Sequence, residues 1–264
     1  GASAGLGAAL ALEYAAPGRT LVLVARRPAP LQAIADRSRA AGARVITAAL
    51  DVRDALAFAA FVQQLEQQDD APIAIDLAIV NAGLFSGRAG DSSAGDSVEP
   101  AAAAAEVLSV NLSGAIATVA AVLPGMRRRR AGRIALITSL AALQPLADAP
   151  AYSASKAGLA AYGEALRELL APDGIAVSIV YPGHIATAQA TIHVGQLPLL
   201  MSADAAARRM RSGLDAGRSA IAFPRLLLWL IRAGRLLPWP LRALLGRSQR
   251  FTVRPGTERS LTAR

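Results

Sequence analysis

Short apolar runs alternate with amphipathic segments along most of the chain. Continuous runs rich in Val, Ile and Leu are typical of buried strands in a parallel sheet, and they predict strands over Thr20–Ala25, Arg44–Ala49, Ile73–Val80, Arg133–Thr138 and Ile175–Val180. Apolar residues at helical spacing predict helices over Ala8–Ala16, Leu31–Ala41, Asp54–Gln68, Ala101–Arg130 and Ala151–Leu170. Strands that alternate with helices in this way indicate an α/β fold with a Rossmann-like, doubly wound parallel sheet.

The pattern predicts one domain with three successive regions. Residues 1–187 would form the cofactor-binding and catalytic core, residues 188–222 a lid over the substrate, and residues 223–264 a basic, apolar, helical C-terminal extension. Residues 86–97 are rich in Gly, Ser and Asp and predict a loop. The chain begins inside a glycine-rich turn, which needs a strand to feed it, so we expect that an N-terminal strand is missing from this sequence.

The amino-acid composition excludes several kinds of fold and active site. The 264 residues are 53% hydrophobic, which excludes intrinsic disorder. The absence of Cys excludes disulfides, thiolate metal sites and Cys nucleophiles, and with two His residues we expect no metal site. The formal net charge of +9 is concentrated in residues 201–264, which hold 13 basic and 3 acidic residues, and Lys156 is the only lysine in the chain.

The glycines of Gly1–Gly7 would let the backbone approach a pyrophosphate at the N-terminus of the first helix. A purely structural turn is the alternative. The next strand ends at Arg26 and Arg27, where an acidic residue would bind the ribose 2′-hydroxyl of NAD(H). Because two guanidinium groups suit a 2′-phosphate, the sequence favours NADP(H) over NAD(H), although Arg is abundant in this chain.

Tyr152 and Lys156 lie four residues apart on a predicted helix and therefore share a face. An adjacent ammonium would lower the high pKa of a tyrosine, so that Tyr152 could exchange a proton with an alcohol or a carbonyl oxygen. Ser139 follows a predicted strand, at the edge where parallel sheets place their ligands. A surface lysine beside a packed tyrosine is the alternative.

Taken together, residues 1–187 resemble the short-chain dehydrogenase/reductase family. The Gly1–Gly7 turn resembles the family's glycine-rich loop, and Asp51-Val52 its acidic pair at the adenine. Asn81-Ala82-Gly83 resembles the turn beneath the adenine ribose, and Pro182–Thr187 the segment that contacts the nicotinamide. Asn111, Ser139, Tyr152 and Lys156 match the family's catalytic set. The Thr before the first glycine is missing, and Ala4 stands where many NADP-preferring members carry a basic or polar residue.

The resemblance implies a role for each matching residue. Tyr152 would transfer the proton, Ser139 would polarise the substrate oxygen, Lys156 would bind the nicotinamide ribose, and Asn111 would link Lys156 to solvent through water. Cofactor contacts are implied for Gly1, Ser3, Gly5, Leu6, Gly7, Arg26, Arg27, Asp51, Val52, Asn81, Ala82, Gly83, Tyr152, Lys156, Pro182, Gly183, Ile185 and Thr187. The family also implies a homo-oligomer built through the long helices.

Two segments that follow the core are candidates for contacts with the substrate and with a membrane. Residues 188–201 are mostly apolar and predict a lid over a hydrophobic pocket, with His184, Gln189 and His193 as candidate substrate contacts or, alternatively, loop residues. In residues 223–247 arginines punctuate Leu and Trp, but uncharged runs such as Leu226–Ile231 are far shorter than the roughly 20 residues that span a bilayer. A membrane-interface segment with Trp229 and Trp239 at headgroup depth would fit. A pair of helices that cap the substrate cleft or bury a subunit contact is the alternative.

We therefore expect an NADP(H)-dependent oxidoreductase that interconverts a small apolar carbonyl compound and its alcohol. The alternatives are a keto-lipid reductase at the membrane surface and a catalytically idle dinucleotide-binding scaffold or sensor. We expect a cytoplasmic protein, with peripheral contact to the inner face of the membrane as the variant, and no nucleic-acid partner, since no nucleic-acid-binding motif is present.

Overall fold

The structure, a computed structural model, describes residues 1–68, 72–88, 99–188 and 199–238, together with residues 190, 193–194, 197 and 252–253. Residues 89–97 of the expected loop lie outside this description, as does the C-terminal extension apart from residues 223–238 and 252–253.

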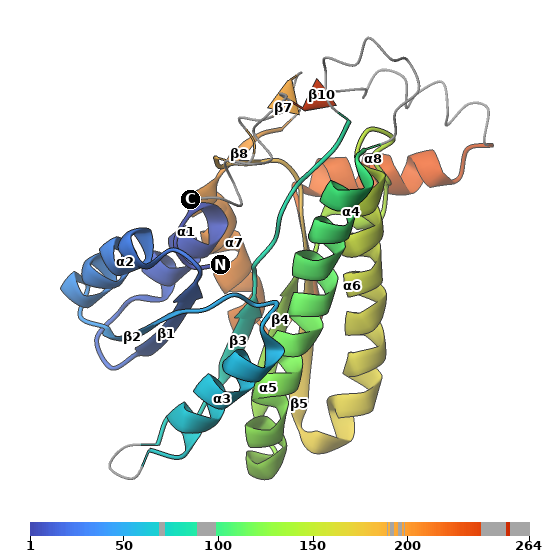
Figure 1. The fold of residues 1–264 in the computed structure, drawn as a ribbon. Coiled ribbons are helices and arrows are strands. Elements are labelled where there is room, and N and C mark those ends of the chain that lie inside the picture. Colours follow the sequence, from blue (N-terminus) through green and yellow to red (C-terminus); the bar gives the residue numbers. More distant parts are fainter. Residues whose placement is uncertain are drawn as a thin grey trace.

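Six parallel strands form the centre of the molecule (Figure 1). Four of them are hydrogen-bonded in the order β3 (Leu77–Val80), β4 (Gly132–Ile137), β5 (Ile175–Pro182) and β9 (Ala220–Phe223). A separate pair consists of β1 (Thr20–Ala25) and β2 (Arg44–Ala49). Among the described residues no strand lies between β1 and β3.

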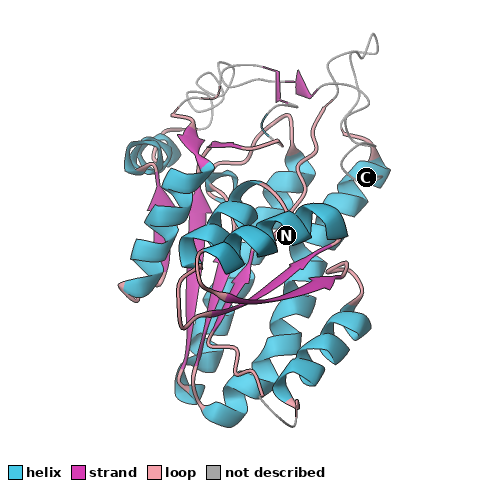
Figure 2. Cartoon of the chain, turned by 90° about the vertical axis from the view of Figure 1, so that its left-hand side faces the viewer, coloured by secondary structure: helices cyan, strands magenta, loops and turns pink. Residues whose placement is uncertain are grey.

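Helices cover the strands on both faces (Figure 2). Helices α1 (Gly5–Tyr14), α2 (Pro28–Ala40) and α7 (Ala203–Asp215) pack on one face. Helices α3 (Ala55–Glu66), α5 (Gly114–Arg129) and α6 (Pro150–Leu170) pack on the other, with α4 (Ala101–Leu108) against α6. This arrangement confirms the predicted Rossmann-like α/β fold.

Strand β4 divides the core between the two faces. Its residues Ile134 and Leu136 join the cluster beneath α3, α5 and α6, whereas Ala135 and Ile137 join the cluster beneath α1 and α7. Side chains alternate between the two faces of a strand, so a continuous apolar run serves both layers. All four residues are buried, which is why the sequence pattern of this segment predicted its strand so well.

Several predicted boundaries differ from the structure by a few residues. The third strand begins at Leu77 rather than Ile73, whose N–H instead bonds the Leu65 carbonyl in the last turn of α3 at 2.9 Å. The fifth strand continues to Pro182. The long helix expected at 101–130 contains a π-helical turn, Ser109–Ser113, and then runs through Pro124 without a break.

The second half of the expected lid region belongs to the sheet layers, since it forms α7 and β9. Short strands precede α7: β6 (Ile185–Ala186) pairs with β8 (Met201–Ser202), and β7 (His193–Val194) pairs with β10 (Thr252–Val253). Beyond β9, helix α8 (Arg225–Arg235) is the described part of the expected helical extension. The sequence pattern does not predict β9, because Ala220–Phe223 has only four residues.

One stretch of the described residues, Ala101–Arg129, is long and apolar enough to cross a membrane by length and composition alone. However, Val119, Val122 and Met126 of this stretch are buried against the sheet. An apolar stripe that faces the core is ordinary for a helix of an α/β protein. We therefore assign the stretch to the core of the fold.

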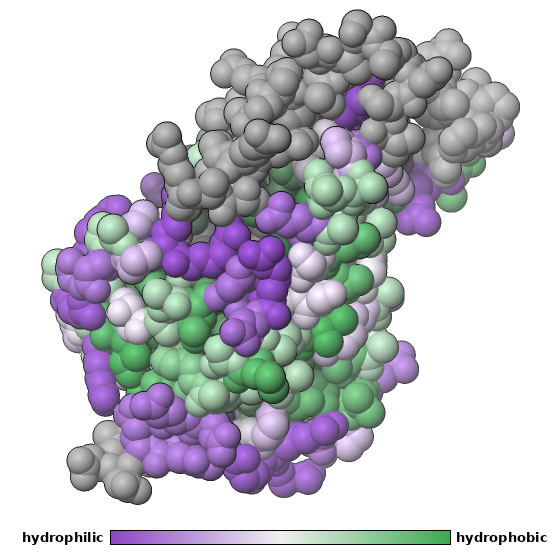
Figure 3. All heavy atoms as spheres, in the orientation of Figure 1, coloured by the Kyte–Doolittle hydropathy of each residue, from purple (hydrophilic) through white to green (hydrophobic). Residues whose placement is uncertain are grey.

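Apolar side chains also reach the surface over α4, α5 and α6, where Figure 3 shows a largely hydrophobic strip. Leu108 and Ile116 are each 38% exposed, and Leu169 is 60% exposed. The homo-oligomer expected through the long helices would cover this face, and it stays a prediction.

Two leucines on different sides of α6 can test which face of this helix packs in the core. Leu159 is 1% exposed in the core, whereas Leu169 of the same helix points outward. We expect Leu159→Ala to lower the free energy of unfolding by about 2–5 kcal/mol through loss of burial and a cavity. Leu169→Ala should change it by less than about 0.5 kcal/mol. Urea denaturation of both variants measures this, and equal effects would contradict the assigned orientation of α6.

Candidate active site

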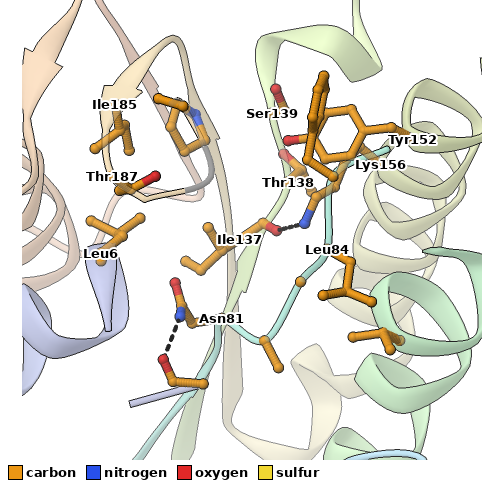
Figure 4. Close-up of a pocket in the computed structure, with 18 of the residues that line it drawn as sticks. Leu6, Asn81, Leu84, Ile137, Thr138, Ser139, Tyr152, Lys156, Ile185 and Thr187 are labelled. Carbon is orange, nitrogen blue, oxygen red and sulfur yellow. Dashed lines mark hydrogen bonds between the residues drawn. The ribbon is translucent and has the colours of Figure 1, made fainter. Parts of the chain in front are cut away.

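A cavity of about 850 Å³ lies at the carboxyl ends of the strands. Parallel α/β sheets bind their ligands at this edge. Of the residues proposed from the sequence, the cavity is lined by Gly1, Ser3, Gly5, Leu6, Arg26, Arg27, Asp51, Val52, Asn81, Ala82, Gly83, Ser139, Tyr152, Lys156, Pro182, Gly183, His184, Ile185 and Thr187. Residues from Leu6 to Thr187 thus converge on one space (Figure 4).

The glycine turn closes one wall of the cavity by packing against the end of β3. The Asn81 side-chain amide donates to the Gly1 carbonyl at 3.2 Å, and the Gly1 and Ala2 nitrogens donate to Val24 at the end of β1. Gly7 does not line the cavity: it is buried, and a Cβ there would clash with the Gly1 carbonyl and with Asn81. Gly7 therefore supports the turn from behind, and its predicted contact with the cofactor stays a prediction.

The N-terminus of α1 is suited to an anionic group. Gly5 begins the helix with φ +54°, a left-handed conformation that favours glycine. The N-cap residue is Ala4, which makes no side-chain cap, and the first turn holds no acidic residue. The free N–H groups at the start of α1 and the positive end of the helix dipole adjoin the cavity, as pyrophosphate binding requires. The residues present therefore fit a dinucleotide.

Charged residues line the cavity at the ends of β1 and β2. Arg26 and Arg27 are exposed and line the cavity just after β1. Asp51 follows β2 and pairs with Arg53, whose Nη2 lies 2.6 Å from Asp51 Oδ2. Hydrogen bonds from Arg53 lower the pKa of Asp51 despite partial burial. This pairing was not predicted, although Asp51 stands two residues before Arg53 in the sequence.

Tyr152 and Ser139 meet at the other end of the cavity. Tyr152 stands on the first turns of α6, and Ser139 follows β4, where its hydroxyl accepts from the Ala141 N–H at 3.1 Å. Burial raises the pKa of Tyr152, and a hydrogen bond with the Ser139 side chain partly opposes this. We predicted a lowered pKa. The structure instead makes desolvation the larger effect, so that Tyr152 is a protonated phenol at neutral pH.

Lys156 lies one helical turn beyond Tyr152. Its ammonium Nζ donates to the Ile137 carbonyl at 2.9 Å and lies 5.9 Å from the centre of the Tyr152 ring. Burial lowers the pKa of Lys156 to about 8. The hydrogen bond links α6 to the end of β4 and so places Tyr152 beside Ser139 (Figure 4).

Asn111 lies in the π-helical turn and does not line the cavity. Its Oδ1 accepts from the Leu84 N–H at 2.7 Å, and its Nδ2 donates to the Leu84 carbonyl at 2.9 Å and to Ser155 Oγ at 3.0 Å. The side chain therefore joins the loop after β3 to α6. The expected link from Asn111 to solvent through water stays a prediction.

Several residues that line the cavity carry no sequence motif and were not predicted. Phe85 makes an edge contact with Tyr152, with ring centres 4.8 Å apart. Gln144 and Leu146 come from the loop after β4, and Leu227 and Ile231 come from α8. Only the fold brings these residues to the site, and apart from Gln144 they are apolar.

Of the three residues proposed to contact the substrate, the structure describes the side chain of one. His184 lines the cavity, and burial lowers its pKa, so that it is neutral at pH 7. Gln189 and the side chain of His193 lie outside the described residues. Within the described part of the chain, no group of three or more His, Asp or Glu residues could hold a metal ion.

The cavity of this chain has a glycine turn at one end and a Ser–Tyr–Lys set at the other. The family described as short chain dehydrogenase matches residues 1–194. The chain belongs to the short-chain dehydrogenase family. As a short-chain dehydrogenase it is an oxidoreductase that acts on alcohol and carbonyl groups with a nicotinamide dinucleotide.

Individual relatives of this short-chain dehydrogenase cover most of its length. An uncharacterized oxidoreductase of Myxococcus xanthus is 35% identical over 241 residues, 91% of this chain and 92% of that protein. The ketoacyl reductase HetN of Nostoc is 34% identical over 73% of this chain and 64% of its own length. Among solved structures, a short-chain dehydrogenase from Sphingobium yanoikuyae in complex with NADPH has a TM-score of 0.74 and 28% identity, covering 89% of this chain and 91% of that one.

The buried ammonium of Lys156 gives a stability prediction. Its folded-state pKa lies below the ordinary value, so the charge costs stability at neutral pH. We expect Lys156→Met to raise the free energy of unfolding of the ligand-free protein at pH 7 by roughly 1 kcal/mol, after about 1.5–3 kcal/mol is subtracted for the lost charge-assisted hydrogen bond.

The pH dependence provides the check. Between about pH 8 and the unfolded value of 10.5 the unfolded chain holds a proton that the folded protein has released. The stability of the parent protein should therefore rise with pH across this window, and Lys156→Met should lack the rise. Urea denaturation at several pH values measures both. A less stable variant at pH 7 would show that the bond to Ile137 outweighs the cost of burying the charge.

Proposed function

We propose that this short-chain dehydrogenase uses NADP(H) to interconvert an apolar ketone or aldehyde and its alcohol. The proposal rests on the convergence of Ser139, Tyr152 and Lys156 on one cavity. The rest of the cavity wall near these three residues is mostly apolar. The placement of an arginine pair at the other end supports the choice of cofactor.

The preference for NADP(H) rests on Arg26 and Arg27. Both are exposed and line the cavity directly after β1, where the ribose-recognising residue of a Rossmann-like fold belongs. Neither position is acidic, so a 2′-hydroxyl would find no carboxylate there. Two planar guanidinium groups can instead hold a 2′-phosphate through charge-assisted hydrogen bonds. The NADPH bound to the Sphingobium relative agrees with this assignment.

Proton transfer belongs to Tyr152. Because burial raises its pKa, Tyr152 holds its proton at neutral pH and can donate it to a carbonyl oxygen that Ser139 also hydrogen-bonds. Lys156 would bind the ribose hydroxyls and hold Tyr152 in position through α6. When bound, the reduced nicotinamide supplies the hydride that the carbonyl carbon accepts. The same groups act in reverse on an alcohol, for which Tyr152 must first lose its proton.

The substrate class follows from the wall around Tyr152. Phe85, Leu140, Leu146, Leu227 and Ile231 line this end and would exclude water around an apolar chain. Gln144 and neutral His184 offer the polar contacts. A relative described as a ketoacyl reductase supports a substrate with a keto group on an acyl chain.

Replacing Tyr152 tests the mechanism. We expect Tyr152→Phe to lower kcat for NADPH-dependent reduction about 10²–10⁴-fold, since general acid catalysis contributes a factor of that size. NADPH affinity should be unchanged, because the ring remains. The measurement is NADPH consumption with ketones of increasing chain length, together with fluorescence titration of NADPH.

Tyr162→Phe is the matched control, since Tyr162 lies on the same helix and packs against the core. It should leave turnover unchanged. Full activity of Tyr152→Phe would refute the proton-transfer role. NADPH binding by the parent protein without turnover of any carbonyl would favour the idle dinucleotide-binding scaffold.

Cofactor preference is tested at the arginine pair. We expect the double variant Arg26→Ala, Arg27→Ala to weaken NADPH binding at least about tenfold while NADH binding changes little, because each charge-assisted bond contributes about 1.5–3 kcal/mol. The control is Arg208→Ala, Arg209→Ala, an exposed arginine pair on α7 that does not line the cavity. Equal weakening of NADPH and NADH by the first variant would show that the pair does not recognise a 2′-phosphate.

A further inference from the structure

Helix α8 has two apolar faces, although it contacts the rest of the described protein through only one of them. Its inner residues Leu227, Leu228 and Ile231 pack against the core cluster around Leu140 and Tyr181. Leu227 and Ile231 of this inner face also line the cavity. The helix therefore separates the substrate end of the cavity from the surroundings.

The outer residues form an exposed apolar ridge. Leu226 is 60% exposed, Trp229 65% and Leu230 59%, and Leu236 at the helix end is 87% exposed. Residues 226, 229 and 230 share a helical face because they are three and four positions apart. Contiguous exposed apolar residues of this size mark an interaction surface rather than chance exposure.

Positive charge borders this ridge. Arg225, Trp229 and Arg232 follow one another at spacings of four and three residues and so lie along one side of it. The Arg232 guanidinium lies 5.8 Å from the centre of the Trp229 ring. In the sequence, residues 216–257 contain eight arginines and no Asp or Glu. A partner that matches this ridge and its arginines therefore has an apolar interior beneath a negatively charged surface.

We propose that the outer face of α8 docks on an anionic lipid bilayer, with Leu226, Trp229 and Leu230 in the headgroup boundary and the arginines on lipid phosphates. An amphipathic helix with Leu and Trp on one side and arginines beside them is suited to this position. Tryptophan favours the same depth. Each arginine near an anionic surface adds to the attraction.

The docking surface has a consequence for the substrate, which rests on the proposed function. Because opposite faces of α8 touch the cavity and the bilayer, an apolar carbonyl compound dissolved in the lipid can enter beside Leu227 and Ile231 without crossing water. The substrate class is then a membrane-soluble keto compound.

Intrinsic fluorescence can report the docking directly. Trp229 and Trp239 are the two tryptophans of the chain, so Trp239→Phe leaves Trp229 as the single reporter. Vesicles of phosphatidylglycerol and phosphatidylcholine should shift its emission to the blue and bind the protein in co-sedimentation. Vesicles of phosphatidylcholine alone should do so much less, and added salt should weaken the binding.

A matched pair of variants locates the contact. Leu226→Ser with Leu230→Ser should weaken vesicle partitioning at least about tenfold through the loss of apolar burial. Leu56→Ser with Leu169→Ser is the control, since these leucines are 86% and 60% exposed on other helices. That control should bind vesicles as the parent does. The measurement needs neither cofactor nor substrate, so its failure would leave the proposed oxidoreductase function intact.

Three results would overturn the proposal. One is the absence of binding to the anionic vesicles, and another is equal binding by the two double variants. The third is blue-shifted Trp229 emission before vesicles are added, with loss of self-association in the Leu226→Ser, Leu230→Ser variant, which would assign the ridge to a contact between copies of the chain.

Discussion

The bond from the Lys156 ammonium to the Ile137 carbonyl fixes the geometry on which the rest of the site depends. It joins the first turns of α6 to the carboxyl end of β4 at 2.9 Å. Tyr152 on the helix and Ser139 after the strand are thereby held at one point. The bond is formed in a buried setting that disfavours the charge it uses, so the arrangement is kept at a cost in stability, as is common at catalytic sites.

Much of the molecule could be predicted from the sequence because local pattern and buried environment agree. The strands Thr20–Ala25 and Arg44–Ala49 have the predicted boundaries, and the residues proposed for the cofactor and the proton transfer line one cavity, apart from Gly7 and Asn111. Glycine turns and strand ends carry local signals, since backbone conformation and alternating burial leave a mark on neighbouring residues.

The remainder depended on long-range contacts that leave no local mark. The π-helical turn at Ser109–Ser113 places Asn111 against Leu84, a residue far away in the sequence. The raised pKa of Tyr152 depends on how deeply it is buried, and spacing from Lys156 could not reveal that. Likewise, Leu227 and Ile231 read as parts of an amphipathic helix, and only its docking against Leu140 brings them to the cavity.

The cavity is lined by residues from two distant parts of the chain. Arg26 and Arg27 follow β1 at one end, whereas Ser139, Tyr152 and Lys156 lie at the other end, after β4 and on α6. A ligand that reaches from one end of the cavity to the other would contact both parts at once and hold them together. Since a ligand stabilises the state that binds it, the resistance of this protein to heat and proteolysis would follow the cofactor supply of the cell, and its lifetime could report that supply.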